Sequence, residues 1–195
     1  MTNHPTILGI DPGSRFMGFA VIRGHELLDY GVHTMRNGRR PYDVMGQARA
    51  RVLDLIRRHT PSVVAIEEPM LLPTKRAALI SAIGQELHER ARELGIQVVE
   101  LSPMKARKVV MGNPRGTKME TAEALVKRYG DLRSLQPKRP ARAVLGPSDK
   151  DRYWLHMFDA LALTAALQSL GEEGDSDHPD RVGGVNSVDG SRWGV

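Results

Sequence analysis

The order of strand-like and helical segments limits the fold of this chain more than any other feature. Three apolar segments of strand length come first, and two pairs of one helix and one strand follow them. The strand candidates are residues 6–10, 18–22, 27–34, 63–66 and 97–101. The connection 23–25 is short enough for a hairpin, so we expect the chain to open with an antiparallel meander. The order predicts an α/β fold with a mixed five-stranded sheet and helices on both faces.

Four helices are predicted from apolar residues that recur at helical spacing. The first carries apolar residues between Val44 and Ile56 and ends before Pro61, because proline cannot continue a helix. The second covers residues 75–94, and Gly95 follows at the position of a C-cap. The last two are predicted at residues 117–129 and 153–170.

Residues 1–170 are expected to form a single domain, because a chain of 195 residues is long enough for one well-buried core but short for two. Within it, residues 131–152 are rich in proline and basic side chains and lack periodicity. This favours a mobile loop suited to phosphate contact, although a solvated connector has the same composition. Residues 171–195 contain glycines, acids and few apolar side chains, which predicts a disordered tail.

Charge and cysteine content narrow the functional classes. The net charge is +5, and because the last 25 residues hold six acids and two arginines, residues 1–170 carry +9. A basic body is typical of proteins with a polyanionic partner, although it can also serve solubility alone. The absence of cysteine excludes disulfides and thiolate zinc sites. Without a bilayer-length apolar stretch or a secretory signal, we expect a cytoplasmic protein with no membrane partner.

Two candidate catalytic acids follow apolar strands. Asp11 ends the run ILGID, and Glu67 ends the run VVAIE. A carboxylate at a strand end faces an open crevice, so these two side chains could converge, although Asp-Pro-Gly is also ordinary turn chemistry. Glu68 competes with Glu67, because alternate strand residues face opposite sides and only one of the two can point at Asp11. Spacing alone leaves that choice open.

A third acid, Asp159, lies in the most apolar helix, with His156 one turn earlier on nearly the same face. A buried unpaired charge is costly, so Asp159 needs a partner, which could be a core contact or a cation. Three carboxylates and one imidazole without a thiolate form an oxygen-rich set suited to Mg²⁺ or Mn²⁺. Two such ions could activate a water and stabilise the leaving 3′ oxygen in phosphodiester hydrolysis.

Three motifs, taken in order, resemble those of the RuvC-like Holliday junction resolvases of the RNase H-like superfamily: ILGIDPGSR, AIE and HMFDALA, spread between about residues 7 and 165. The resemblance implies an RNase H-like fold and a homodimeric endonuclease that nicks the two strands of a four-way DNA junction symmetrically. It implies that Asp11, Glu67 and Asp159 bind the metal ions, and it favours Glu67 over Glu68. It places His156 where other members have a fourth acid or a histidine, so His156 is a candidate metal ligand and catalytic residue.

The same resemblance implies contacts to DNA and to other proteins. Arg107, Lys108 and Lys118 are similar to a basic pair near the scissile phosphate in the family, and a cation beside a helix N-terminus forms a phosphate site. Ser14 and Arg15 of the first motif are also expected to contact DNA. Residues 83–85, Ile-Gly-Gln, are similar to part of the family's dimer-forming helix, and a branch-migration motor could hand over the junction.

Three alternatives remain open. A nuclease of the same fold could act on replication forks, flaps or precursor ribosomal RNA, although RNA-processing YqgF-type proteins are usually shorter and lack the last motif in this form. An actin-like ATPase shares the Gly-Ile-Asp-x-Gly element but needs two such domains, and 195 residues supply one. An inactive junction-binding protein would lose a metal carboxylate, whereas all three acids are present here.

Overall fold

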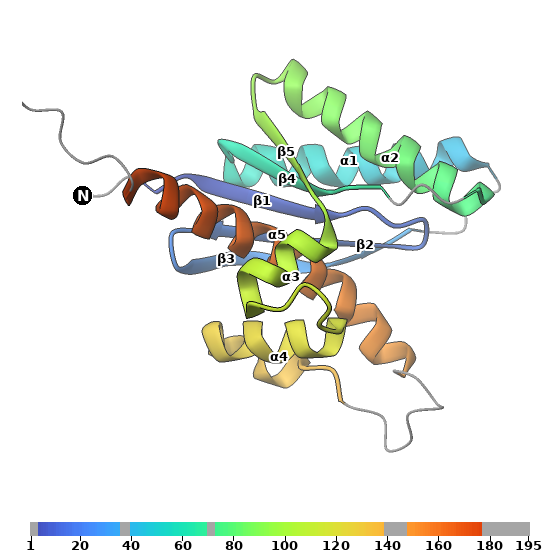
Figure 1. The fold of residues 1–195 in the computed structure, drawn as a ribbon. Helices are drawn as coiled ribbons and strands as arrows, with labels where there is room; N and C mark the ends of the chain where they lie inside the picture. The colour runs from blue at the N-terminus through green and yellow to red at the C-terminus, as the bar shows by residue number, and fades with distance from the viewer. Residues whose placement is uncertain (1–3, 36–39, 70–72, 139–147, 177–195) are drawn as a thin grey trace, which may run out of the picture.

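The computed structural model describes residues 4–35, 40–69, 73–138 and 148–176. Its strands are β1 (Thr6–Asp11), β2 (Phe16–Arg23), β3 (Glu26–Thr34), β4 (Val63–Glu67) and β5 (Gln97–Leu101). Its helices are α1 (Pro41–His59), α2 (Lys75–Glu93), α3 (Pro103–Met111), α4 (Lys118–Arg128), the 3₁₀ helix η1 (Gly130–Leu135) and α5 (Asp149–Ser176). Figure 1 shows these elements around one sheet.

The five strands are hydrogen-bonded in the order β3-β2-β1-β4-β5. The first three form an antiparallel meander, in which Asp11 of β1 lies opposite Gly18 of β2. The other two strands run parallel to β1. Because parallel strands end at the same edge of a sheet, β1 and β4 bring their last residues, Asp11 and Glu67, to one edge.

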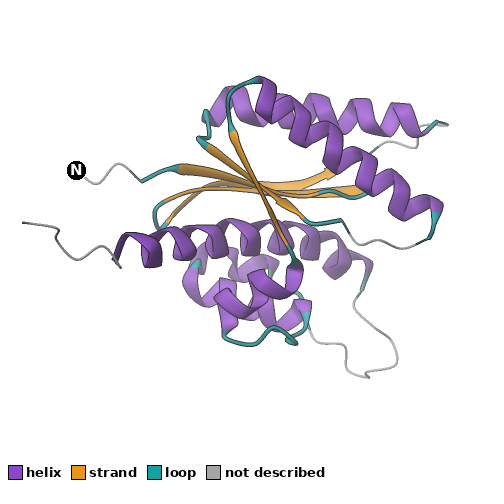
Figure 2. Cartoon of the chain, turned by 45° about the horizontal axis from the view of Figure 1, so that its top comes forward, coloured by secondary structure: helices purple, strands orange, loops and turns teal. Residues whose placement is uncertain are grey.

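Helices cover both faces of the sheet (Figure 2). One core layer packs α1 and α2 against Leu8, Ile10 and other residues of one face, and the second packs α3, α4 and α5 against the opposite face. All six residues of β1 are buried, as expected for a strand covered on both sides. Ile7 belongs to the layer of α5, and because alternate residues share a face, Asp11 points to that layer too.

Two glycines let α5 lie unusually close to the sheet. A Cβ atom at Gly18 would come within 1.9 Å of the His156 carbonyl oxygen, and one at Gly9 within 2.4 Å of the Ala160 carbonyl oxygen. Both distances are far below van der Waals contact, so only glycine fits at these positions without moving the helix. The glycines thereby fix where residues 156–160 lie above β1 and β2.

The predicted fold is confirmed in its strand number, its strand directions and its two helical layers. The predicted loop at residues 131–152 is shorter than expected, because residues 131–135 lie in η1 and α5 begins at Asp149. The predicted tail also begins too early, because α5 continues to Ser176. The remaining parts of these segments, residues 139–147 and 177–195, lie outside the described residues.

The short helix α3 was not among the predicted elements. Its signals are local: the Ser102 side chain accepts a hydrogen bond from the Lys105 amide, and Pro103 occupies the first helical position. Gly112 ends the helix with a left-handed backbone. None of the helices in the described part of the chain is long and apolar enough to cross a membrane.

Candidate metal centre and its basic surroundings

Strand alternation decides which of the two adjacent glutamates joins Asp11. In β4, Ala65 packs in the layer of α5, whereas Val64 and Ile66 pack in the layer of α1 and α2. Glu67 is two residues after Ala65 and therefore faces α5, on the same side as Asp11. Glu68 is exposed, and its amide donates to the Leu101 carbonyl beyond the end of β4. The geometry thus selects Glu67, in agreement with the resemblance.

The third carboxylate comes from α5. Oxygen atoms of Asp11, Glu67 and Asp159 all lie within 4.8 Å of one another, although the three residues are far apart in the sequence. Asp11 and Asp159 are 6% and 8% exposed, so the cluster is mostly removed from water. A compact set of three carboxylates offers hard oxygen ligands, which suit a divalent cation of the Mg²⁺ or Mn²⁺ type.

The three carboxylates are costly to ionise together, because they are buried and close to one another. Burial raises the pKa of Glu67 to about 8, and the negative charges of Asp11 and Asp159 add to the effect. Burial also raises the pKa of Asp159 to about 6, and the charge of Asp11 acts in the same direction. Like charges in a partly dry site disfavour one another's ionisation, and a bound divalent cation reverses that preference. The arrangement therefore favours positive charge between the carboxylates.

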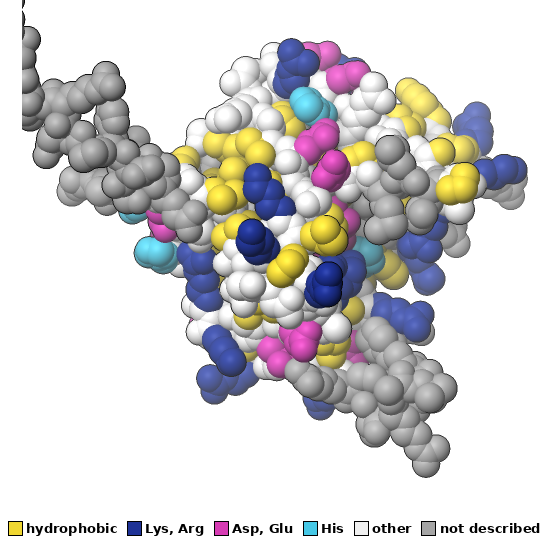
Figure 3. Space-filling view, viewed as in Figure 1, with side chains coloured by type: hydrophobic (Ala, Val, Ile, Leu, Met, Phe, Trp, Pro, Cys, Tyr) yellow, Lys and Arg dark blue, Asp and Glu magenta, His cyan; other side chains and the backbone are white. Residues whose placement is uncertain are grey.

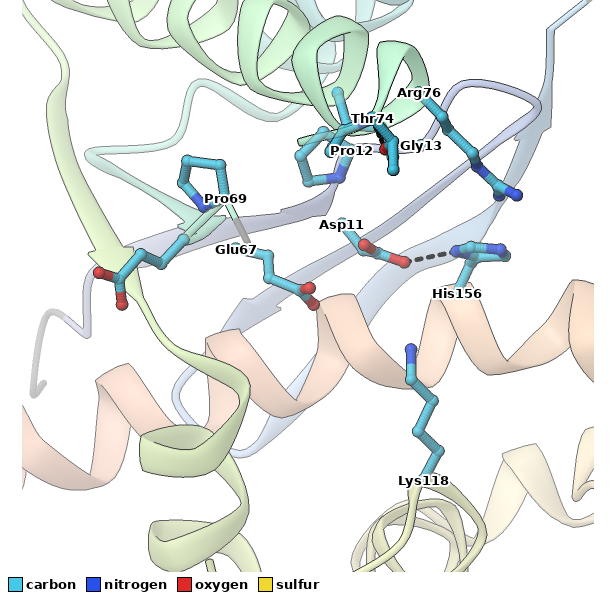
Figure 4. A pocket seen from close by; sticks show the side chains of 12 residues that line it. Asp11, Pro12, Gly13, Glu67, Pro69, Thr74, Arg76, Lys118 and His156 are labelled. Atoms are coloured by element: carbon cyan, nitrogen blue, oxygen red, sulfur yellow. Dashed lines mark hydrogen bonds and ion pairs between the residues drawn. The ribbon is translucent and has the colours of Figure 1, made fainter. Parts of the chain in front are cut away.

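Lys118 supplies one such charge from the start of α4. Its ammonium group forms an ion pair with Asp159, and Figure 4 shows it reaching up towards the carboxylates. Burial alone would lower the pKa of Lys118, but the charges of Asp159 and Asp11 outweigh it and hold the pKa above its usual value. The helix start itself is fixed by Thr117 and Glu120, which form a capping box.

His156 lies beside the carboxylates and contacts one of them. Its Nδ1 atom is 2.5 Å from Oδ2 of Asp11, as the dashed line in Figure 4 marks. Among the described residues, the close group of potential metal ligands consists of the three carboxylates and does not include His156. In this structure the imidazole therefore orients Asp11, and its expected role as a fourth metal ligand stays a prediction.

The residues expected to contact DNA fall into two groups. Arg107, in α3, is half-buried, and its charge partly offsets the rise in the pKa of Glu67. Together with Lys118, it is thus electrostatically coupled to the carboxylates. Ser14 and Arg15 lie between β1 and β2, beside the site, whereas Lys108 is an exposed residue in the last turn of α3.

A cavity of about 300 Å³ opens beside the carboxylates, and it includes residues that the sequence analysis did not single out. Thr74, Arg76 and Ile80 come from the first turns of α2, and they line the cavity together with Asp11 and Glu67. The Thr74 side chain caps α2 by accepting from the Ala77 amide. The sequence did carry a signal for these residues, a threonine cap followed by Lys-Arg. Basic side chains are disfavoured at the start of a helix, so their presence there indicates a possible role in binding an anion.

The fold and the site together define a class of protein, an RNase H-like domain with an acidic centre suited to divalent metal ions. The model of the family "Crossover junction endodeoxyribonuclease RuvC" matches residues 7–144 of this sequence. The chain belongs to this family. His156 and Asp159 lie beyond the matched segment, so their place in the site comes from the structure.

The relatives of this chain include three proteins that carry the same family name. The protein from Protochlamydia amoebophila is 32% identical over 142 residues, which cover 68% of this chain and 81% of the relative. The protein from Synechococcus sp. (strain WH7803) is 30% identical over 139 residues, which cover 69% of this chain and 88% of the relative. The chain also matches a Bacteroides fragilis relative at 29% identity, of which it covers 66%.

Solved structures show the same fold. Thermus thermophilus RuvC has a TM-score of 0.67 at 22% identity, with 87% of this chain and 96% of that chain covered. The same protein in complex with a Holliday junction substrate gives 0.66 at 22% identity, with 88% and 97% covered. The yeast mitochondrial Holliday junction resolvase Ydc2 gives 0.56 at 13% identity, with 88% and 80% covered. At these identities, the likeness concerns the fold alone.

Proposed function

We propose that this protein is a metal-dependent endonuclease that resolves four-way DNA junctions by paired symmetric nicks. The observation that carries the proposal is the group of three carboxylates within 4.8 Å, from β1, β4 and α5, with a lysine paired to one of them. Membership of the RuvC family supplies the substrate class, because its relatives are named crossover junction endodeoxyribonucleases. A basic net charge of +5 agrees with a polyanionic substrate.

Asp11, Glu67 and Asp159 are proposed to hold two ions of Mg²⁺ or Mn²⁺. When bound, such ions activate a water and stabilise the leaving 3′ oxygen of the phosphodiester. The residues of the chain provide the shape of the centre: two carboxylates are fixed at strand ends, and the third is fixed by α5 against Gly18 and Gly9. His156 holds Asp11 through Nδ1, which leaves Nε2 as the nitrogen for any role as a ligand.

Lys118 and Arg107 are proposed to bind the scissile phosphate. Both are positively charged groups close enough to the carboxylates to influence the pKa of Glu67. A cation there lowers the electrostatic barrier to bringing a phosphodiester next to three carboxylates. Ser14, Arg15 and Lys108 are proposed as further contacts to the DNA backbone, which would position the substrate without reading its sequence.

The assembly is proposed to be a homodimer, since two equivalent sites related by a two-fold axis match a two-fold junction. In α2, Gly84 is buried, yet a Cβ there would meet no atom outside its own stretch of helix within 4 Å, and Gln85 beside it is exposed. Because Gly84 has no side chain, a second helix could come closer to α2 at this position. We further propose that the chain has one nuclease domain, whose last element is α5. A branch-migration motor is proposed as the partner that delivers the junction.

Cleavage of defined substrates tests the proposal. Purified protein is incubated with labelled four-way junction, replication fork, flap, linear duplex and structured RNA, with Mg²⁺, with Mn²⁺ and with chelator. We expect paired nicks in the junction only when metal is present. Preferred cutting of forks, flaps or RNA would favour the alternative substrates of the same fold, and metal-independent cutting would refute the role of the carboxylates.

Adjacent glutamates provide a matched pair of variants for the site itself. Glu67→Gln is expected to abolish cleavage and to leave junction binding largely intact, because it removes a metal ligand and no phosphate contact. Glu68→Gln makes the same chemical change one residue later, on an exposed side chain, and is expected to keep wild-type cleavage. Cleavage by the first variant, or its loss in the second, would show that the wrong carboxylate has been assigned.

A further inference from the structure

A second cavity, of about 290 Å³, adjoins the carboxylate centre. It is lined by Arg15, Phe16, Arg76, Arg152 and His156. Arg76 and His156 also line the first cavity, so the two cavities share a wall. Figure 4 shows Arg76 extending from α2 towards His156, while Lys118 approaches the carboxylates from the opposite side. The second cavity therefore lies directly beside the carboxylate centre.

The second cavity is positively charged, and the described residues that line it include no acid. Arg15, Arg76 and Arg152 are all exposed, and within the described part of the chain none of them forms an ion pair with a carboxylate. Figure 3 shows Lys and Arg side chains gathered at the right of the face viewed, next to a histidine. Three like charges around one hollow repel one another, so an anion bound between them is favoured.

Two of the arginines lie at helix starts, where positive side chains are disfavoured. Arg76 is the second residue of α2, whose first turn contains no acid, and Arg152 is the fourth residue of α5, whose first turn also holds Asp149 and Asp151. The helix dipole places partial positive charge at these ends, which weakens the helix when a cation is added and attracts anions. The guanidinium fork matches the oxygen geometry of a phosphate. Both features indicate that these arginines bind a phosphate of a ligand and not a carboxylate of the protein.

The wall of the cavity is held in place by aromatic packing. The Phe16 ring meets Tyr153 edge-on at 5.4 Å between centroids, and the Arg15 guanidinium lies 5.1 Å from the Phe16 centroid. Tyr153 in turn donates to the Val32 carbonyl. The residue beside Arg15 is therefore anchored to α5 and β3, which limits how far this arginine can move from the cavity.

We propose that Arg15, Arg76 and Arg152 bind a backbone phosphate that neighbours the scissile phosphate on the strand to be cut. The inference rests on the proposed nuclease function and names a binding site for its substrate. The metal centre takes one phosphodiester, and the arginine cavity takes a nearby one on the same strand. Two fixed phosphates set the register of the strand, so cleavage falls at one bond rather than at several adjacent bonds.

Binding of the uncut junction provides the first test. Arg15→Gln, Arg76→Gln and Arg152→Gln are each introduced into a Glu67→Gln background, which keeps the DNA intact. We expect each to weaken junction binding by at least about tenfold at low salt, and to reduce the slope of log affinity against log salt by about 0.7 to 0.9. Arg57→Gln is the matched control, since Arg57 is exposed at the end of α1, on the other face of the sheet. Equal affinities and slopes for all four variants would overturn the proposal.

Replacing single DNA phosphates by uncharged analogues identifies which phosphate the arginines contact. Single methylphosphonates are placed, one at a time, at phosphates on either side of the cut. The protein with all three arginines should lose affinity at one such position, and Arg152→Gln should be insensitive there while remaining sensitive elsewhere. If the arginine variants and the parent respond alike at every position, the cavity holds no phosphate of the DNA.

The two proposals fail in different ways. Failure of the wild type to cut any branched DNA would refute the proposed substrate, whereas normal cutting with an unchanged methylphosphonate profile would refute only the arginine site. If the wild type cuts a fork or a flap instead of a junction, the same scan on that DNA decides the arginine site. A cavity that takes free phosphate instead would leave every DNA measurement equal between variants and parent.

Discussion

Gly18→Ala tests whether the close contact between α5 and the sheet builds the catalytic centre. The added Cβ would lie 1.9 Å from the His156 carbonyl oxygen and 2.8 Å from the Met157 backbone nitrogen. Ordinary contact begins at 3.4 Å, so α5 would have to move by about 1.5 Å at this point. The obstacle is backbone rather than a flexible side chain, so a rotamer change cannot relieve it. Because α5 carries His156 and Asp159, the shift separates them from Asp11 and Glu67.

The expected effects can be estimated separately for stability and activity. Overpacking a core costs about 1–3 kcal/mol, and replacing glycine by alanine returns about 0.4–1 kcal/mol by restricting the unfolded chain. With a rigid obstacle we expect a net loss of about 2 kcal/mol, or about 4–8 °C in Tm for a domain of this size. Misplacing catalytic groups by about 1 Å can cost about a hundredfold in rate. Junction cleavage well below the melting temperature should fall by at least that factor.

Gly46→Ala is the control for this experiment. Gly46 lies inside α1, and a Cβ there would meet no atom outside its own stretch of helix within 4 Å. Alanine there should stabilise the protein by about 0.5–1 kcal/mol, because it is the better helix former. Thermal unfolding by circular dichroism and single-turnover cleavage are measured for both variants. A Gly18→Ala protein with wild-type Tm and rate would refute the argument that this contact positions α5.

Three further predictions concern the charges at the centre. Lys118→Met should slow cleavage about a hundredfold or more in single-turnover kinetics, because one cation at the reacting phosphate is lost; an unchanged rate would make Lys118 a purely structural partner of Asp159. In chelator, the contribution of Glu67 to stability should decline as pH rises from about 4.5 to about 8, because its pKa is raised on folding and only the folded state keeps the proton in that window. Added Mg²⁺ should therefore raise Tm more at pH 8 than at pH 6, and Glu67→Gln should reduce that difference to the part that Asp159 contributes; an equal shift at both pH values in the wild type would contradict the coupling. His156→Asp should stay active with Mg²⁺, whereas His156→Ala should be much weaker, and wild-type activity of the latter would reduce His156 to a packing residue.

Two of the three carboxylates could be placed from the sequence because strand geometry is short-range. A parallel pair of strands ends at one edge, and residues two apart share a face, so Asp11 and Glu67 could be expected to meet. The sequence left Glu67 and Glu68 as alternatives, since the register of β4 cannot be read from four apolar residues. The packing of Ala65 against the layer of α5 supplies that register.

The arginine cavity could not be predicted, because its members have no common local pattern. Arg15 follows β1, whereas Arg76 and Arg152 lie in the first turns of α2 and α5. They meet only because α2 and α5 stack on opposite sides of the sheet edge. Basic residues at helix starts are a weak hint, since most such side chains simply point into solvent. The expected 131–152 loop is a related error: composition indicated charge but did not show that α5 begins at residue 149.

Asp159 shows why the buried, apolar middle of α5 hides the direction of the one acid within it. From Met157 to Ala166 every residue of α5 is buried, so hydrophobic periodicity gives no preferred face and no orientation for the carboxylate. Its direction is instead set by Gly9 and Gly18, which let one side of α5 touch the sheet and so turn Asp159 towards the ends of β1 and β4. An acid buried at this point is costly unless it is compensated, and Lys118 provides that compensation in this structure. The glycines and the lysine therefore belong to the site as much as the carboxylates do. Without the glycines Asp159 points elsewhere, and without Lys118 its charge is unpaired.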